Sequence, residues 1–185
     1  MITRDRDRTL WARASRVLPL DAERAWDLVA DARHHTRWVP LTRVDLTRPS
    51  DEAAGPGWER WPGRTAPEVG DEILAVSGPT ARRGGPGLVD RMRIERYERP
   101  LGAVPGVAVF QKLGPVLLGT ARIEVESTGS SARVTWSEAV HLRGLPPGAT
   151  RWLGALLVDA MLRLVLDRAV REATEGTGGT QRTAA

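Results

Sequence analysis

The sequence predicts an α+β fold in which a seven-stranded antiparallel sheet is covered by one long helix at the end of the chain. Three observations predict it. A capped amphipathic helix followed by a tryptophan and a proline occupies residues 20–40, seven segments have the length and pattern of strands, and a long helix with an apolar stripe begins near residue 149. A length of 185 residues suits a single domain built from these elements.

The first predicted elements are a strand over residues 9–18 and a helix over residues 22–31. Asp21 can cap this helix, because its carboxylate can accept a hydrogen bond from the backbone amide of Arg24. Apolar residues recur on one face of the helix, which predicts that this face is buried: Ala25, Trp26, Leu28 and Val29. The polar run at residues 33–37 then either ends the helix or adds a short second one.

The remaining strands are expected to form a meander. Their expected ranges are 39–46, 71–77, 88–97, 104–113, 119–127 and 132–142. Turn signals such as Gly78-Pro79 and Gly129-Ser130 separate them. An irregular segment at residues 47–69 carries Trp58 and Trp61, and loops this long often cover a site. The two tryptophans either form a lid or only anchor the loop.

A long helix is predicted over residues 149–174, after a proline-rich breaker. Its apolar stripe consists of Trp152, Leu156, Leu157, Met161, Leu164 and Val165. The chain therefore divides into an N-terminal extension (1–8), one domain (9–174) and a flexible C-terminal tail (175–185).

The opening order of strand, capped helix and Trp-x-Pro segment resembles the START-like (SRPBCC) superfamily, and most of all its bacterial polyketide cyclase/dehydrase and lipid-transport branch. The residues that carry the resemblance are Ala22, Ala25, Trp26, Leu28, Asp31, Trp38 and Pro40. It covers residues 9–174 and implies a helix-grip fold, in which a strongly curved sheet wraps around the C-terminal helix and short helices lie between strands one and two.

The resemblance also implies a hydrophobic pocket between the sheet and the terminal helix. Its expected lining is Trp38, Pro40, Met92, Ile94, Phe110, Ile123, Trp136, Leu157, Met161 and Leu164. Simple core packing is the alternative role for each of these residues.

Glu138 is an anomaly in the last strand, because it shares the inward phase of Trp136 and Val140. A carboxylate there is costly unless it is paired or near water. Glu138 either lies near an exposed strand end or pairs with an arginine or a backbone amide, or it faces a partly hydrated cavity. In a cavity it could orient a ligand hydroxyl or act as a general base. Asp90 and Arg96, in phase with Met92, carry the same ambiguity.

Composition and motifs exclude several function classes. The net charge is +4, but arginines alternate with acids along the chain, which favours a solvated surface over a nucleic-acid site. The chain lacks cysteine, His34 and His35 are adjacent, and His141 is distant, so neither a metal site nor a cofactor motif is expected. The N-terminus has no apolar core of a signal peptide, and we expect a cytoplasmic protein without a membrane span.

These observations predict a protein that binds a small hydrophobic or amphipathic molecule, lipid-like or polyketide-like, in an internal cavity. One alternative is an enzyme of the polyketide cyclase or dehydratase kind that uses a pocket acid, Glu138 or Asp90, with Arg96. A second is a protein-interaction module that works through its outer arginines. The sequence leaves the ligand, the oligomeric state and the choice between binding and catalysis open.

Overall fold

The computed structural model describes residues 12–47, 66–144 and 147–182, and in the last segment the side chains of residues 157–176. Seven strands form one antiparallel sheet in the order β1-β7-β6-β5-β4-β3-β2. They are β1 (Ala12–Leu18), β2 (Thr42–Thr47), β3 (Glu72–Ser77), β4 (Leu88–Glu98), β5 (Gly106–Pro115), β6 (Leu117–Ser127) and β7 (Ala132–Leu142). The helices are α1 (Ala22–Val29), the 3-10 helix η1 (Ala32–His34), α2 (His35–Trp38), the 3-10 helix η3 (Ala81–Arg83) and α3 (Pro147–Arg182).

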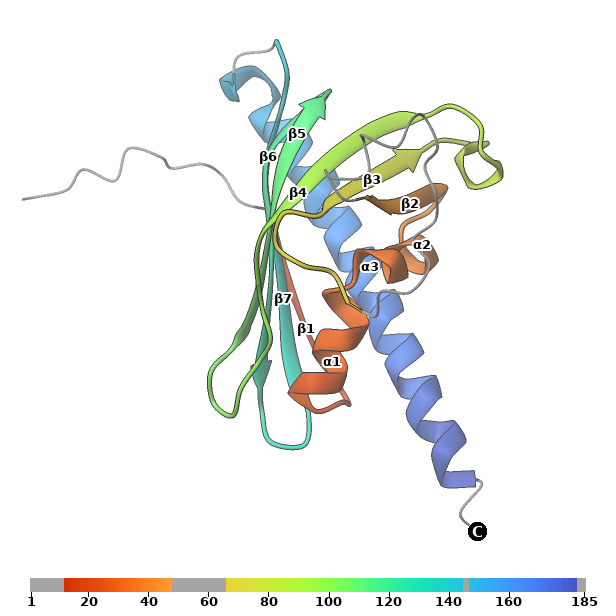
Figure 1. Cartoon of the computed structure of the whole chain (residues 1–185), viewed down its shortest axis with the longest axis vertical. Helices are drawn as coiled ribbons and strands as arrows, with labels where there is room; N and C mark the ends of the chain where they lie inside the picture. The colour runs from red at the N-terminus through yellow and green to blue at the C-terminus, as the bar shows by residue number, and fades with distance from the viewer. Residues whose placement is uncertain (1–11, 48–65, 145–146, 183–185) are drawn as a thin grey trace, which may run out of the picture.

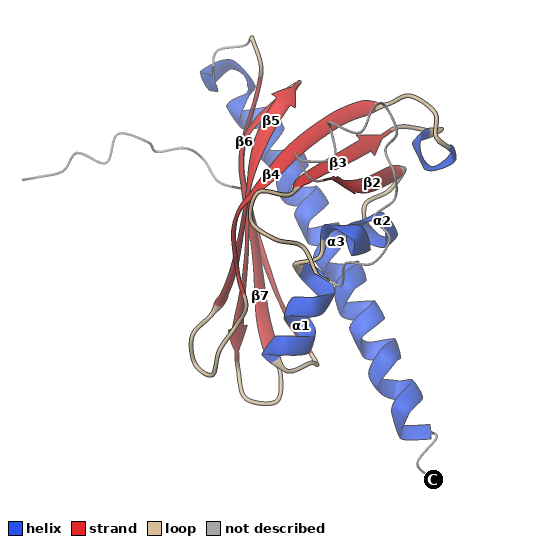
Figure 2. Cartoon of the chain, viewed as in Figure 1, coloured by secondary structure: helices blue, strands red, loops and turns tan. Residues whose placement is uncertain are grey.

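The predicted α+β helix-grip architecture is confirmed. Figure 1 shows the sheet curling around α3, which crosses its concave side from one end to the other. In Figure 2, α1, α2 and α3 lie on the same side of the sheet. Within the described part of the chain, no helix is both long and apolar enough to cross a membrane.

The connection between β1 and β2 is built from α1, η1 and α2. Asp21 caps α1 as predicted, and its carboxylate accepts from the amide of Arg24 at 2.8 Å. The polar run forms η1 and α2 rather than extending α1. Trp38 ends α2 and does not begin a strand, because Pro40 and a left-handed Leu41 (φ 54°) turn the chain before β2 starts at Thr42.

An irregularity in β4 changes which residues face the concave side. Ile94 pairs with Phe110 and Arg96 pairs with Val109, so Glu95 is an extra residue in the ladder. Such a bulge reverses the inward and outward alternation beyond it. Arg96 therefore lies on the exposed side, whereas Tyr97 turns inward and packs edge-on against Trp26 with ring centroids 5.0 Å apart.

The buried face of α3 is rotated about the helix axis relative to the apolar stripe that the sequence predicted. The buried positions recur every three or four residues along the helix: Leu162, Val165, Leu166, Ala169 and Ala173. Leu157 is 69% exposed and Leu164 is 37% exposed, so neither is part of the buried face. Leucines occur on both sides of this helix, so its sequence period did not define one face. The side chains of Trp152 and Leu156 lie outside the described residues.

Candidate functional site

A cavity of about 230 Å³ lies between the concave face of the sheet and α3. This volume is slightly below the range of pockets that hold drug-sized ligands, which is about 300–1,000 Å³. Most of the wall is apolar, and it includes Val44, Ile73, Met92, Phe110, Ala121, Trp136, Val140, Val158, Met161 and Leu162. The polar members of the wall are His35, Thr42, Ser77, Asp90, Lys112 and Glu138.

Three charged side chains meet on the sheet side of this cavity. The Lys112 ammonium lies 2.5 Å from Asp90 Oδ2 and 3.6 Å from Glu138 Oε2. Only 4% of the Lys112 side chain and 7% of the Glu138 side chain are exposed. We call Asp90, Lys112 and Glu138 the charged cluster.

Strand pairing explains how these three residues meet. Lys112 on β5 pairs with Met92, two positions from Asp90 on β4. Glu138 lies on β7, and β6 runs between it and Lys112. The β6 residues that pair with Lys112 and Glu138 are Gly119 and Ala121, so little side-chain bulk separates the ammonium from the Glu138 carboxylate.

The electrostatics of the cluster keep Lys112 charged. Burial alone would lower the pKa of Lys112, but the neighbouring Glu138 and Asp90 carboxylates outweigh it and the pKa is raised. The ammonium also approaches the thioether of Met92 at 3.6 Å, a weak acceptor. A ligand oxygen could replace this sulfur as the third acceptor of the Lys112 ammonium.

Among the described residues of the cavity wall, two buried polar atoms have no hydrogen-bond partner. They are Asp90 Oδ1, an acceptor, and Trp136 Nε1, a donor. Buried polar groups are normally paired, so unpaired ones in a cavity wall mark positions where a ligand could bond.

His35 lies in the cavity wall, and its imidazole is neutral at pH 7. Its Nε2 lies 2.8 Å from the carbonyl oxygen of Val29, so Nε2 carries the proton that it donates. Its ring lies 4.7 Å from that of Trp136, measured between centroids. Burial lowers the pKa of His35 to about 4, which makes the imidazole neutral at pH 7.

A hydroxyl pair forms a second polar point. The Oγ1 of Thr42 and the Oγ of Ser77 lie 2.7 Å apart, and Thr42 also donates to the carbonyl of Pro40 at 3.1 Å. Ser77 is on the same strand as Ala75, which pairs with Asp90. The hydroxyl pair and the charged cluster therefore belong to the same wall.

The sequence-predicted site residues divide into two groups. The structure places Asp90, Met92, Phe110, Trp136, Glu138 and Met161 in the cavity wall. Trp38, Ile94 and Ile123 are buried in the core but are not part of this wall, and Pro40 is exposed.

Arg96, Leu157 and Leu164 are corrections to the expected lining. Arg96 pairs with Glu98 outside the cavity, because the bulge at Glu95 turns it outward. The two leucines lie on the exposed flank of α3. The possible lid residues Trp58 and Trp61 lie outside the described residues.

Sequence reasoning missed Lys112 and His35. Lys112 is the single lysine of a chain with 27 lysines and arginines in total, and it stands two positions after Phe110 in a strand. An unusual residue type in an inward phase was a usable signal for it. No comparable sequence signal marks His35, since its burial depends on a short helix packing against Trp136.

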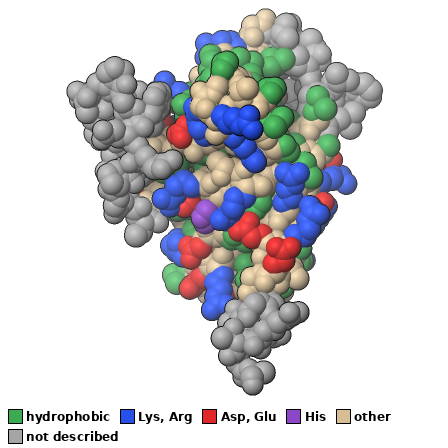
Figure 3. Space-filling view, turned by 90° about the vertical axis from the view of Figure 1, so that its right-hand side faces the viewer, with side chains coloured by type: hydrophobic (Ala, Val, Ile, Leu, Met, Phe, Trp, Pro, Cys, Tyr) green, Lys and Arg blue, Asp and Glu red, His purple; other side chains and the backbone are tan. Residues whose placement is uncertain are grey.

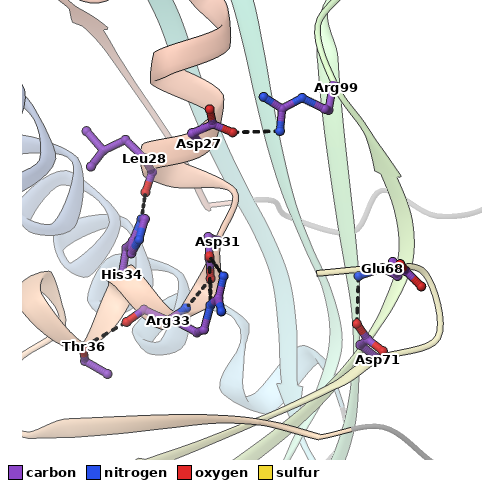
Figure 4. A network of polar contacts seen from close by, with 9 residues as sticks. All are labelled: Asp27, Leu28, Asp31, Arg33, His34, Thr36, Glu68, Asp71 and Arg99. Carbon is purple, nitrogen blue, oxygen red and sulfur yellow. Dashed lines mark hydrogen bonds and ion pairs between the residues drawn. The ribbon is translucent and has the colours of Figure 1, made fainter. Parts of the chain in front are cut away.

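A separate polar network lies at the corner formed by α1 and η1 (Figure 4). Asp31 pairs with Arg33 through its side chain and caps η1 through the amide of the same residue at 3.0 Å. His34 bonds to the carbonyl of Leu28 at 3.0 Å, and Arg99 pairs with Asp27 at 2.7 Å. These contacts fix the corner, and none of their residues lines the cavity.

Outside the cavity, several of the described arginines are paired with nearby acids. Glu72 binds Arg91 and Arg93, each at 2.7 Å, on the opposite side of the sheet from the cavity. On the lower half of the face in Figure 3, basic and acidic side chains are interspersed. Among the described residues, no group of three His, Asp or Glu side chains is placed to hold a metal ion.

Comparisons by sequence find no match to a protein-family model or to a curated protein. Solved structures are similar in fold. A hypothetical protein from Helicobacter pylori has a TM-score of 0.62 at 12% identity, with coverage of 89% of this chain and 88% of that one. The ZhuI aromatase/cyclase from Streptomyces sp. R1128 has a TM-score of 0.55 at 12% identity, covering 89% and 93%.

A third similar structure is norcoclaurine synthase from Thalictrum flavum, with a TM-score of 0.57 at 12% identity. The alignment covers 90% of this chain and 95% of that one. At these identities the likeness shows the fold alone, since one fold hosts many functions.

Proposed function

We propose that this protein binds a small, mainly apolar molecule in the cavity between the sheet and α3, in the cytoplasm, with a polar group of the ligand held at the charged cluster. The observation that carries the proposal is a largely apolar cavity whose wall contains Asp90, Lys112 and Glu138. Burial of apolar ligand surface would supply affinity at about 25 cal/mol per Å². The cluster would orient the ligand.

Binding of a neutral fluorescent dye, N-phenyl-1-naphthylamine, tests the proposal. We expect its emission to rise and saturate with the wild-type protein. Ala75 lines the cavity, and an Ala75→Leu variant places three more carbon atoms in it. This variant should bind the dye weakly or not at all. Ala103, exposed in the turn between β4 and β5, provides the control Ala103→Leu, which should bind like wild type. Equal binding by all three proteins would refute the proposal.

A second candidate is acid–base catalysis on a ketone, and the contact between Lys112 and Glu138 favours it. The Glu138 carboxylate would take a proton from the carbon next to the carbonyl group. The electrons of that C–H bond would form the enolate double bond, and the Lys112 ammonium would stabilise the negative oxygen. Lys112 thereby takes the part for which the sequence had suggested Arg96.

Proton exchange tests this candidate separately from binding. In D₂O, the methylene protons of phenylacetone should exchange faster with wild-type protein than without it, as measured by NMR. Glu138→Gln should remove the acceleration, whereas Glu98→Gln, on a residue that pairs with Arg96 outside the cavity, should keep it. If the protein binds the dye but does not accelerate the proton exchange, the binding function stands and the catalytic function is refuted.

A further inference from the structure

The ionisable groups of the cavity wall do not balance in charge. They are His35, Asp90, Lys112 and Glu138. The imidazole of His35 is neutral at pH 7 because burial lowers its pKa to about 4. Among the described residues of the wall, one ammonium and two carboxylates remain, so these residues carry a formal charge of minus one.

The acceptor capacity of the two carboxylates also exceeds the donors that reach them. Asp90 uses Oδ2 for Lys112, while its Oδ1 has no partner. Glu138 is 3.6 Å from the ammonium, longer than the 2.7–2.9 Å that is typical of charge-assisted hydrogen bonds. Arg91 and Arg93 are the described arginines nearest in sequence to Asp90. Both bind Glu72 on the other side of the sheet. The described part of the wall therefore has one cation fewer than it has carboxylates.

We propose that the ligand of this cavity is a small apolar amine, bound as its ammonium ion against the carboxylates of Asp90 and Glu138. This inference rests on the proposed binding function and adds the charge of the ligand to it. An incoming ammonium ion would bring the formal charge of the filled site to zero and give the free oxygen of Asp90 a donor. A carboxylate ligand, such as a fatty acid, would raise the negative charge to minus two in a largely apolar space and is selected against.

The apolar part of the wall determines the chemistry and size of the rest of the ligand. Val44, Ile73, Met92, Phe110 and Val158 offer only apolar contact, so the body of the amine is hydrocarbon. The volume of about 230 Å³ limits it to a compact chain or ring.

Displacement of N-phenyl-1-naphthylamine by three matched compounds at pH 7 tests the inference: octylamine, octanol and octanoate share one hydrocarbon chain and differ in the head group. We expect octylamine to displace the dye at a concentration at least about tenfold lower than octanoate and clearly below that of octanol. Equal potency of octylamine and octanol, or stronger displacement by octanoate, would overturn the inference. Because the dye is neutral, its own binding tests the cavity independently, so loss of dye binding would instead refute the proposed function.

Two variants test whether the ammonium ion binds at the carboxylates of the charged cluster. Asp90→Asn keeps the size of the side chain and removes one negative charge, so the advantage of octylamine over octanol, measured for both against the dye affinity of the variant itself, should fall toward one. Glu98→Gln removes a charge outside the cavity and should keep the full advantage. An unchanged advantage in Asp90→Asn would place the amine elsewhere and overturn the inference. If Asp90→Asn fails to fold, Glu138→Gln provides the same comparison with the same expected result.

Discussion

At the scale of single residues, Lys112 offsets part of the negative charge of Asp90 and Glu138 in the cavity wall. It is buried between two carboxylates, and its raised pKa reflects their attraction. Removing one partner of a buried charged group leaves the others uncompensated, which costs far more than losing an exposed ion pair.

Replacing Lys112 with Met should lower the free energy of unfolding at pH 7 by about 3–5 kcal/mol, because Asp90 and Glu138 then face an apolar space without a cation. Urea denaturation measures this loss. Arg133→Met is the control, since its pair with Glu126 is exposed and 3.9 Å long, and it should cost less than about 1 kcal/mol. Equal stability of Lys112→Met and wild type would contradict the role of Lys112.

His35 should make stability depend on pH. Its pKa is lowered by burial to about 4 in the folded protein, against about 6.5 in an unfolded chain. Between these values the unfolded state binds a proton that the folded state does not bind. The free energy of unfolding should therefore fall as the pH drops from about 6.5 to 4, by up to ~3 kcal/mol.

Urea denaturation at a series of pH values, compared with a His35→Gln variant, isolates this contribution from that of the carboxylates. The variant should lose the part of the slope that His35 causes. If His35→Gln and wild type show the same slope, His35 titrates normally and the prediction is wrong.

At the scale of elements, the bulge in β4 and the glycine in β6 decide which side chains reach the cavity. The extra residue Glu95 turns Arg96 away from it. Gly119 adopts φ 131°, and a Cβ built there would lie 1.9 Å from the carbonyl oxygen of Ala139. Gly119 pairs with Lys112 on β5 and with Val140 on β7, and β6 and β7 approach each other too closely there to admit a side chain.

Gly119→Ala should therefore destabilise the protein by about 2–3 kcal/mol, because the backbone must leave its conformation to admit the methyl group. Thermal or urea unfolding measures the effect. Gly129→Ala is the matched control: it also has a positive φ of 87°, but nothing lies within 4 Å of the added Cβ. A loss at Gly119 no larger than that at Gly129 would show that β6 and β7 can separate at little cost.

At the scale of the whole molecule, α3 joins the two edges of the curved sheet. At one edge, Asp167 accepts from Arg16 of β1 at 2.7 Å. Near the other edge, Glu172 accepts from the indole of Trp38 at 2.7 Å, and Arg168 donates to the Trp38 carbonyl at 2.6 Å. These contacts fix residues 167–172 of α3 against β1 and the end of α2, directly after the part of the helix that lines the cavity.

A ligand that fills this cavity should stabilise the entire fold, because it binds only where sheet and helix are both in place. The neutral dye at 100 times its dissociation constant should raise the free energy of unfolding by about 2.7 kcal/mol. Urea denaturation with and without dye measures the rise. Ala75→Leu should show little rise, and stabilisation of this variant equal to that of wild type would indicate binding outside the cavity.

The sequence predicted an element correctly where the signal lay within that element. The N-cap at Asp21 and the range of β7 follow from hydrogen-bonding capacity and from strict alternation, and both are observed. Two predictions were wrong: β2 begins at Thr42 rather than at residue 39, and α3 is rotated so that Leu157 and Leu164 are exposed. The turn at Pro40 and Leu41 delays the start of β2, whereas packing against the sheet selects the buried face of α3.

By itself, then, the sequence determined the fold class, the order of elements and the inward phase of Asp90 and Glu138, because these depend on residue periods within one segment. Only the tertiary structure brought Lys112 between those carboxylates and moved Arg96 away. The contact joins three strands, and the side on which Arg96 lies depends on one extra residue in the β4 ladder. Neither feature has a local period, so the chemistry of the cavity could be assigned only after the strands had been placed side by side.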